Sequence, residues 1–169
     1  MAIFHRYNSE IHGNYRRAYL IGGLLTGLLM AAYIVVRLLM RNPVESPFSM
    51  VIDVLLLVML FLLTAYYRNS LPDKRITLKE AMLFGVGLAL VAGVVYGLLL
   101  WIIGTLAPQQ TVLFTQTMVK NPQQAPASYW AAWWAILSAI EVMLLGAFGA
   151  FLAAIFFRNE KAEIKHKTK

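Results

Sequence analysis

Hydrophobic and polar residues occur in long separate blocks along this chain. Four stretches are almost entirely apolar, at about residues 18–40, 47–67, 78–104 and 129–157. Each is at least as long as the roughly 20 residues that a helix needs to cross the hydrocarbon core of a bilayer. Because backbone amides find no water in that core, each stretch is expected to be helical. We therefore predict an all-α polytopic membrane protein with four transmembrane helices, forming one membrane domain over residues 1–169.

The segments between the blocks give the expected helix boundaries. Thr77-Leu-Lys-Glu80 matches a capping box, which starts the third helix near Leu78. Ser46 followed by Pro47 predicts the start of the second helix. Residues 105–128 form the longest connection, and residues 158–169 form a polar basic tail. Residues 1–17 fit either a short helix on the membrane surface or a solvated tail, because their apolar residues have helical spacing but are mixed with arginines.

Composition supports this class. Sixty per cent of the residues are hydrophobic and only 14% are charged, which lies outside the range of soluble domains. The net charge of +7 does not indicate nucleic-acid binding, because the basic residues lie between the apolar blocks. The first apolar block is also too long for the core of a signal peptide. We expect the lipid bilayer to be the main partner and expect no nucleic-acid partner.

The basic residues also predict the orientation. Twelve of the fifteen Lys and Arg residues lie on one side of the predicted helices, in the N-terminal segment, the 2–3 connection and the C-terminal tail. The other three are Arg37, Arg41 and Lys120. Under the positive-inside rule both termini are cytoplasmic. Four tryptophans at the opposite ends of the third and fourth helices are consistent with an interfacial belt: Trp101, Trp130, Trp133 and Trp134.

Small residues recur at intervals of four along three of the predicted helices. Such spacing forms a groove that lets a second helix approach closely. The candidate helix-packing residues are Gly23, Gly27, Ala31, Gly85, Ala89, Gly93, Gly97, Gly146 and Ala150.

Glu141 lies near the middle of the last helix, where a charged side chain costs roughly 2.5–3.5 kcal/mol on insertion scales. Tyr33 and Tyr96 lie at similar depths in the first and third helices, so two phenols are placed to hydrogen-bond this carboxyl group. We consider a structural contact between helices first, then a proton or ion relay, then a ligand contact. Arg37 and Asp53 flank the short loop between the first two helices and predict an interfacial ion pair, with a transport gate as the alternative.

The last helix has two faces that need protein neighbours. At 100° per residue its small residues gather on one face, and Glu141 lies on the nearly opposite face. If the small face packs inside the bundle, Glu141 points outward; if Glu141 points inward, the small face is left for another chain. Either arrangement predicts other membrane subunits or a homo-oligomer as partners.

The sequence gives little support for catalysis. The three histidines lie in the predicted tails, there is no cysteine, and no nucleophile–base pair can be assembled within the helices. We therefore expect no enzyme activity, no cofactor and no metal site. The tryptophan cluster leaves a quinone or pigment contact as an alternative to the interfacial belt.

The chain also resembles a known family. Tyr66-Tyr-Arg68, Lys74-Arg-Ile-Thr-Leu-Lys-Glu-Ala81, the glycine-rich helix with Tyr96 and Trp101, and Glu141 with Gly146 carry the resemblance. The family comprises small four-helix bacterial inner-membrane proteins catalogued as domain of unknown function four-one-nine-nine. The connection at 105–128 departs from it, since that of the family is typically longer and richly charged. The resemblance implies four helices and supplies no catalytic residues. We expect an accessory or structural subunit of a larger membrane complex, or alternatively a small homo-oligomeric transporter or channel using Glu141.

Overall fold

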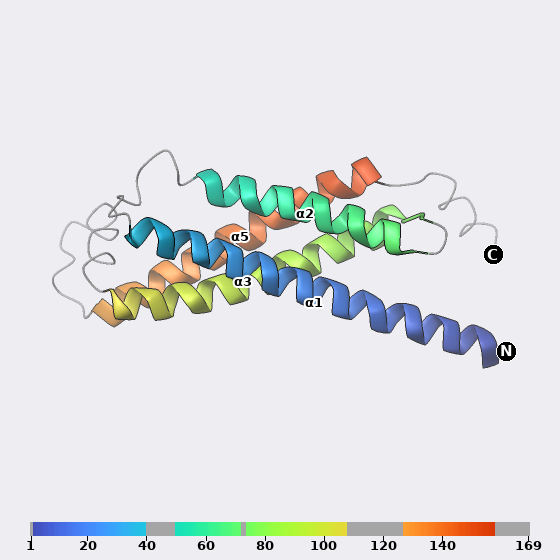
Figure 1. Ribbon diagram of the computed structural model, residues 1–169, viewed down its shortest axis with the longest axis horizontal. Helices are drawn as coiled ribbons and strands as arrows, with labels where there is room; N and C mark the ends of the chain where they lie inside the picture. The colour runs from blue at the N-terminus through green and yellow to red at the C-terminus, as the bar shows by residue number, and fades with distance from the viewer. Residues whose placement is uncertain (1, 40–49, 72–73, 108–126, 158–169) are drawn as a thin grey trace.

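The computed structural model describes residues 2–39, 50–71, 74–107 and 127–157, with backbone alone for residues 2–14 and for residue 127. Within these ranges the chain forms four α-helices, namely α1 (Ala2–Leu39), α2 (Met50–Ser70), α3 (Leu78–Leu106) and α5 (Ala127–Phe157) (Figure 1). All four contain a stretch long and apolar enough to cross a membrane. The predicted all-α class and the four apolar helices are therefore confirmed.

The start of α3 can be compared with its predicted boundary. The helix α3 begins at Leu78, where the Thr77 hydroxyl accepts a hydrogen bond from the Glu80 backbone N–H at 3.2 Å. The Thr77 backbone N–H in turn donates to the Glu80 carboxylate at 3.1 Å. The predicted capping box is therefore confirmed. The predicted start of the second helix at Pro47 lies outside the described residues, and so does the predicted tail 158–169.

The helix α1 differs from the expected boundary at residue 18. It is continuous from Ala2, so the segment expected as a surface helix or a tail extends the first transmembrane helix. Its apolar part covers Tyr15–Leu39, and Figure 1 shows the remaining turns projecting past the other helices. The continuation has a local reason: the stretch from Ala2 to Tyr15 contains no proline and only one glycine, so nothing in it stops a helix.

The helix α3 lies at the centre of the bundle. It makes its most extensive contact with α5 and its second with α1, while α2 packs more on α5 than on α1 or α3. The helix α5 begins beside α3 and crosses toward α2, because Ala135 and Ala139 lie against α3 while Gly149 lies against Leu57 and Leu60 of α2. We call the end where α1 and α3 finish the Arg37 end, and the opposite end the Tyr15 end.

The Tyr15 end is held by an aromatic cluster that the sequence patterns did not identify. The rings of Tyr67 and Phe84 stack at 4.6 Å, and the ring of Tyr15 contacts both edge-on, at 5.6 and 6.1 Å. These residues come from α1, α2 and α3. Aromatic pairs in such geometries contribute about 0.5–1.5 kcal/mol each beyond their buried area. The cluster therefore fixes three helices relative to one another at this end.

Candidate functional site

The small residues of α3 and α5 form the tightest contact in the bundle. A methyl group added at Gly85 would lie 2.5 Å from the Ala150 Cβ, and one added at Gly97 would lie 2.9 Å from the Ala139 Cβ. One added at Gly146 would overlap the Cβ of Ala89. The two helices run antiparallel with their small faces together, as small-xxx-small packing requires.

The glycines of α1 pack in the same way against α3. A methyl group at Gly23 would lie 2.6 Å from the Val91 Cβ, and one at Gly27 would lie 2.8 Å from the carbonyl oxygen of Ala92. Ala31, one turn further along, is buried. The predicted packing residues are thus used inside this chain, and their small faces are covered by the chain's own helices.

One polar side chain from each helix belongs to a group of interacting residues. Arg37 of α1 is only 6% exposed, and Tyr96 of α3 is only 4% exposed. Tyr96 interacts electrostatically with Arg37, with Asp53 of α2 and with Glu141 of α5. We call these four residues the polar cluster. Tyr96 thus interacts with Asp53 and Arg37, which were predicted as neighbours, and also with Glu141, which was predicted as its own contact.

Tyr33 lies beside Arg37. The guanidinium of Arg37 lies 5.9 Å from the centre of the Tyr33 ring, a cation–π geometry. The Tyr33 ring therefore packs near the guanidinium group of Arg37, one turn away on α1. The predicted ion pair of Arg37 with Asp53 and the predicted hydrogen bonds to Glu141 stay predictions.

Glu141 is exposed on the outside of the bundle. The small face of α5 packs against α3, so of the two arrangements considered for this helix the outward one is present. Exposed apolar residues continue along the same side of α5, within about four turns of Glu141: Leu137, Leu144, Phe148 and Ile155. We call Glu141 together with these four the outer face of α5. Asp53, which interacts electrostatically with Glu141, carries a charge of the same sign.

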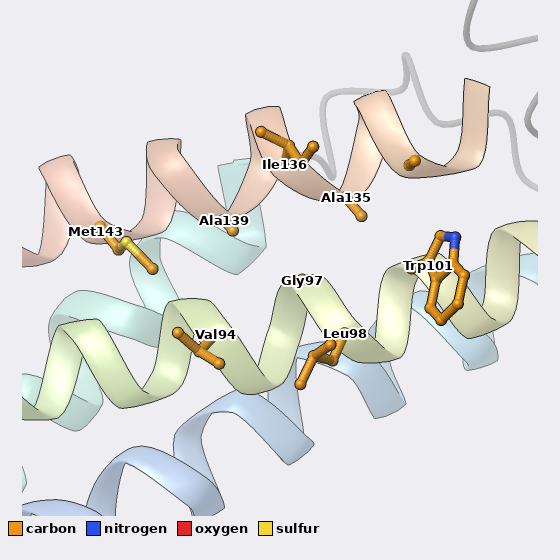
Figure 2. A pocket seen from close by; sticks show the side chains of 9 residues that line it. Val94, Gly97, Leu98, Trp101, Ala135, Ile136, Ala139 and Met143 are labelled. Carbon is orange, nitrogen blue, oxygen red and sulfur yellow. The ribbon is translucent and has the colours of Figure 1, made fainter. Parts of the chain in front are cut away.

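A pocket lies between α3 and α5. It is an apolar groove of about 310 Å³, with Gly97, Ala135 and Ala139 along its length (Figure 2). Trp101 lies at one end of the groove and Met143 at the other (Figure 2). The groove exists because three neighbouring positions have almost no side chain, and its lining suits only an apolar group.

The tryptophans do not form one surface belt. Trp101 and Trp133 are exposed, but Trp134 is buried in the hydrophobic core. Its position one residue after Trp133 turns its ring by about 100° toward the bundle. The prediction of an interfacial belt therefore does not extend to Trp134. Among the described residues, no three Asp, Glu, His or Cys side chains gather as metal ligands.

The comparison with protein families identifies the chain. Residues 22–159 match the family described as "Protein of unknown function (DUF4199)", and these residues make up most of the sequence. The chain belongs to the DUF4199 family. The family resemblance predicted from the sequence is therefore confirmed. Neither a curated protein nor a solved structure shows a match to the chain.

The DUF4199 match contains the whole candidate site. It begins at Gly22, beside the first interhelical glycine contact, and runs past the end of α5. The polar cluster, the outer face of α5 and the apolar groove all lie inside it. The first twenty residues of α1, Ala2 to Ile21, precede it. The DUF4199 region therefore contains all three of these features, whereas Tyr15 of the aromatic cluster precedes it.

Proposed function

We propose that this protein is a non-catalytic integral membrane protein that serves as an accessory or structural subunit, packing against other helices in a larger bacterial membrane complex. The observation that carries the proposal is Glu141, an exposed carboxyl group close to the middle of the Ser128–Phe157 span. Lipid chains offer such a group no hydrogen bond and no counter-charge. A protein neighbour on this side of α5 supplies both.

The packing inside the bundle limits the surfaces to which such a neighbour can bind. The glycine faces of α1, α3 and α5 are already covered by the chain's own helices. They hold the bundle together and leave the outer face of α5 for association. We further propose that both termini are cytoplasmic in the inner membrane, on the basis of the distribution of Lys and Arg.

Native mass spectrometry of the tagged protein, extracted from its own membranes in mild detergent, tests this function. We expect other subunits to accompany it in a fixed ratio. We also expect the variant Glu141→Lys, which reverses the charge, to lose those subunits while the protein itself stays folded. A protein that is recovered alone, or only as a homo-oligomer, contradicts the accessory role.

The polar cluster favours a second candidate, a small homo-oligomeric transporter or channel. Four helices each contribute one polar side chain to it, and Arg37 and Tyr96 are buried there. Ionisable residues at membrane depth often line ion or proton pathways. The variant Glu141→Gln, reconstituted in liposomes, separates the two functions. A transporter loses flux and keeps its assembly, whereas a packing subunit shows no flux in either form.

A further inference from the structure

The outer face of α5 is apolar along its length except at one position. Leu144 and Phe148 are 68% and 59% exposed, so this side of the helix is not covered by the chain itself. Leu137, Glu141, Leu144 and Phe148 follow one another at steps of four, three and four residues. That spacing forms the continuous ridge that packs against another helix.

Glu141 lies in the middle of this ridge, and it is exposed there. Asp53 interacts with it and has the same sign. Two acidic groups that interact in a medium of low dielectric favour a positive charge beside them. The exposed carboxyl group of Glu141 is therefore complementary to a cation at membrane depth.

Among its described residues, a second copy of the chain offers no exposed basic side chain at this depth. In the part of the chain that the structure describes, the exposed basic residues lie at or beyond the ends of the apolar spans: Arg16, Arg17, Lys74, Arg75 and Lys79. Arg37, the basic residue of the polar cluster, is buried inside its own bundle. A symmetric pair of α5 helices places Glu141 against Glu141.

We propose that the outer face of α5 binds a transmembrane helix of a different protein that carries a lysine or arginine at the depth of Glu141. The apolar ridge provides the packing, and the carboxylate pairs with the ammonium or guanidinium group. Charge-assisted hydrogen bonds of this kind fix the depth and the register of one helix against the other. This proposal rests on the accessory function proposed above and names the chemistry of the partner.

Synthetic helices test it directly. The chain contains no cysteine, so a single Ser128→Cys substitution at the start of α5 allows one fluorescent donor on the full-length protein. The probes are leucine–alanine transmembrane peptides with an acceptor label and with Lys, Gln or Leu at the central position, all in the same liposomes. We expect the Lys peptide to bind about tenfold more tightly than the Leu peptide, the factor that a close charge pair typically gives.

Two variants make the result specific to the carboxylate. The first, Glu141→Gln, keeps the shape of an exposed side chain and should remove the preference for Lys over Leu. The second combines Glu141→Leu with Phe148→Glu, which moves the carboxylate seven residues, about 10.5 Å along the same face. This variant should prefer a peptide whose lysine is displaced by the same distance.

Equal binding of the three peptides overturns the proposal, and so does a preference for Lys that survives in Glu141→Gln. Either result leaves the accessory function open to its own test. If subunits still accompany the protein in native mass spectrometry while the peptides show no preference, the function stands and the charge pairing fails. If the Lys preference is present but no subunit accompanies the protein, the accessory function fails and the binding chemistry of α5 stands.

Discussion

The contact between α1 and α3 gives the sharpest prediction of stability. Gly23→Ala adds one methyl group that would lie 2.6 Å from the Val91 Cβ and 2.8 Å from the carbonyl oxygen of Leu88. Both atoms are fixed to the backbone of α3, so no rotation of a side chain relieves the contact. Ordinary van der Waals contact begins at 3.4 Å, so the helices must separate locally by 0.8 Å.

A separation of this size has an estimable cost. A gap of about 0.5–1 Å forfeits a quarter to a half of the dispersion energy of the atoms that face it, and overpacking of a core costs about 1–3 kcal/mol. The rigid neighbours favour the upper end of that range. Replacing glycine by alanine in a helix also stabilises the helix by roughly 1 kcal/mol, which offsets part of this cost. We therefore expect Gly23→Ala to lower the free energy of unfolding by about 2 kcal/mol.

The neighbouring glycine provides the matched control. A methyl group at Gly22 meets the terminal methyl groups of Leu63 and Leu88 at 3.0 and 3.2 Å, and these ends can move. Gly22→Ala should therefore be neutral or slightly stabilising. The assay is unfolding by SDS in mixed micelles, followed by tryptophan fluorescence for the parent and both variants. If Gly23→Ala is as stable as Gly22→Ala, the close contact of α1 with α3 does not control the stability, and the reasoning is refuted.

Two further predictions concern the Tyr15 end. Thr77→Ala removes the hydroxyl that accepts the Glu80 N–H and should destabilise the start of α3 by about 1 kcal/mol. Hydrogen exchange measured by mass spectrometry should then speed up at residues 78–81 and stay unchanged at the end of α3; unchanged exchange at 78–81 contradicts the role of the cap. Phe84→Ala, at a ring only 1% exposed and stacked on Tyr67, should lower the unfolding free energy by about 3–5 kcal/mol in the same SDS assay. Phe148→Ala, on the outer face of α5, should change it far less, and equal losses for the two variants would contradict the core position of Phe84.

The sequence determined those features that depend on local chemistry and on length. Four apolar stretches are long enough to cross a bilayer, and backbone hydrogen bonding makes them helices whatever their neighbours. Thr77 and Glu80 start α3 because they are three residues apart and can bond each other's backbone. The glycine spacing identified the residues that contact other helices, since only positions without a side chain allow such approach. Each of these features depends on residues that are close to one another in the sequence.

The tertiary structure decided which helices those contacts join and which way each face turns. Periodicity placed Glu141 opposite the small face of α5, but it left open which of the two faces would be inside. The fit of Gly146 against Ala89 and of Gly97 against Ala139 turns the small face inward and leaves Glu141 exposed. Trp134 is buried although Trp133 beside it is exposed, because the packing of α5 on the other helices decides which of two adjacent residues faces inward. The polar cluster joins residues from four helices, and interactions between residues so distant in sequence depend on how the helices pack.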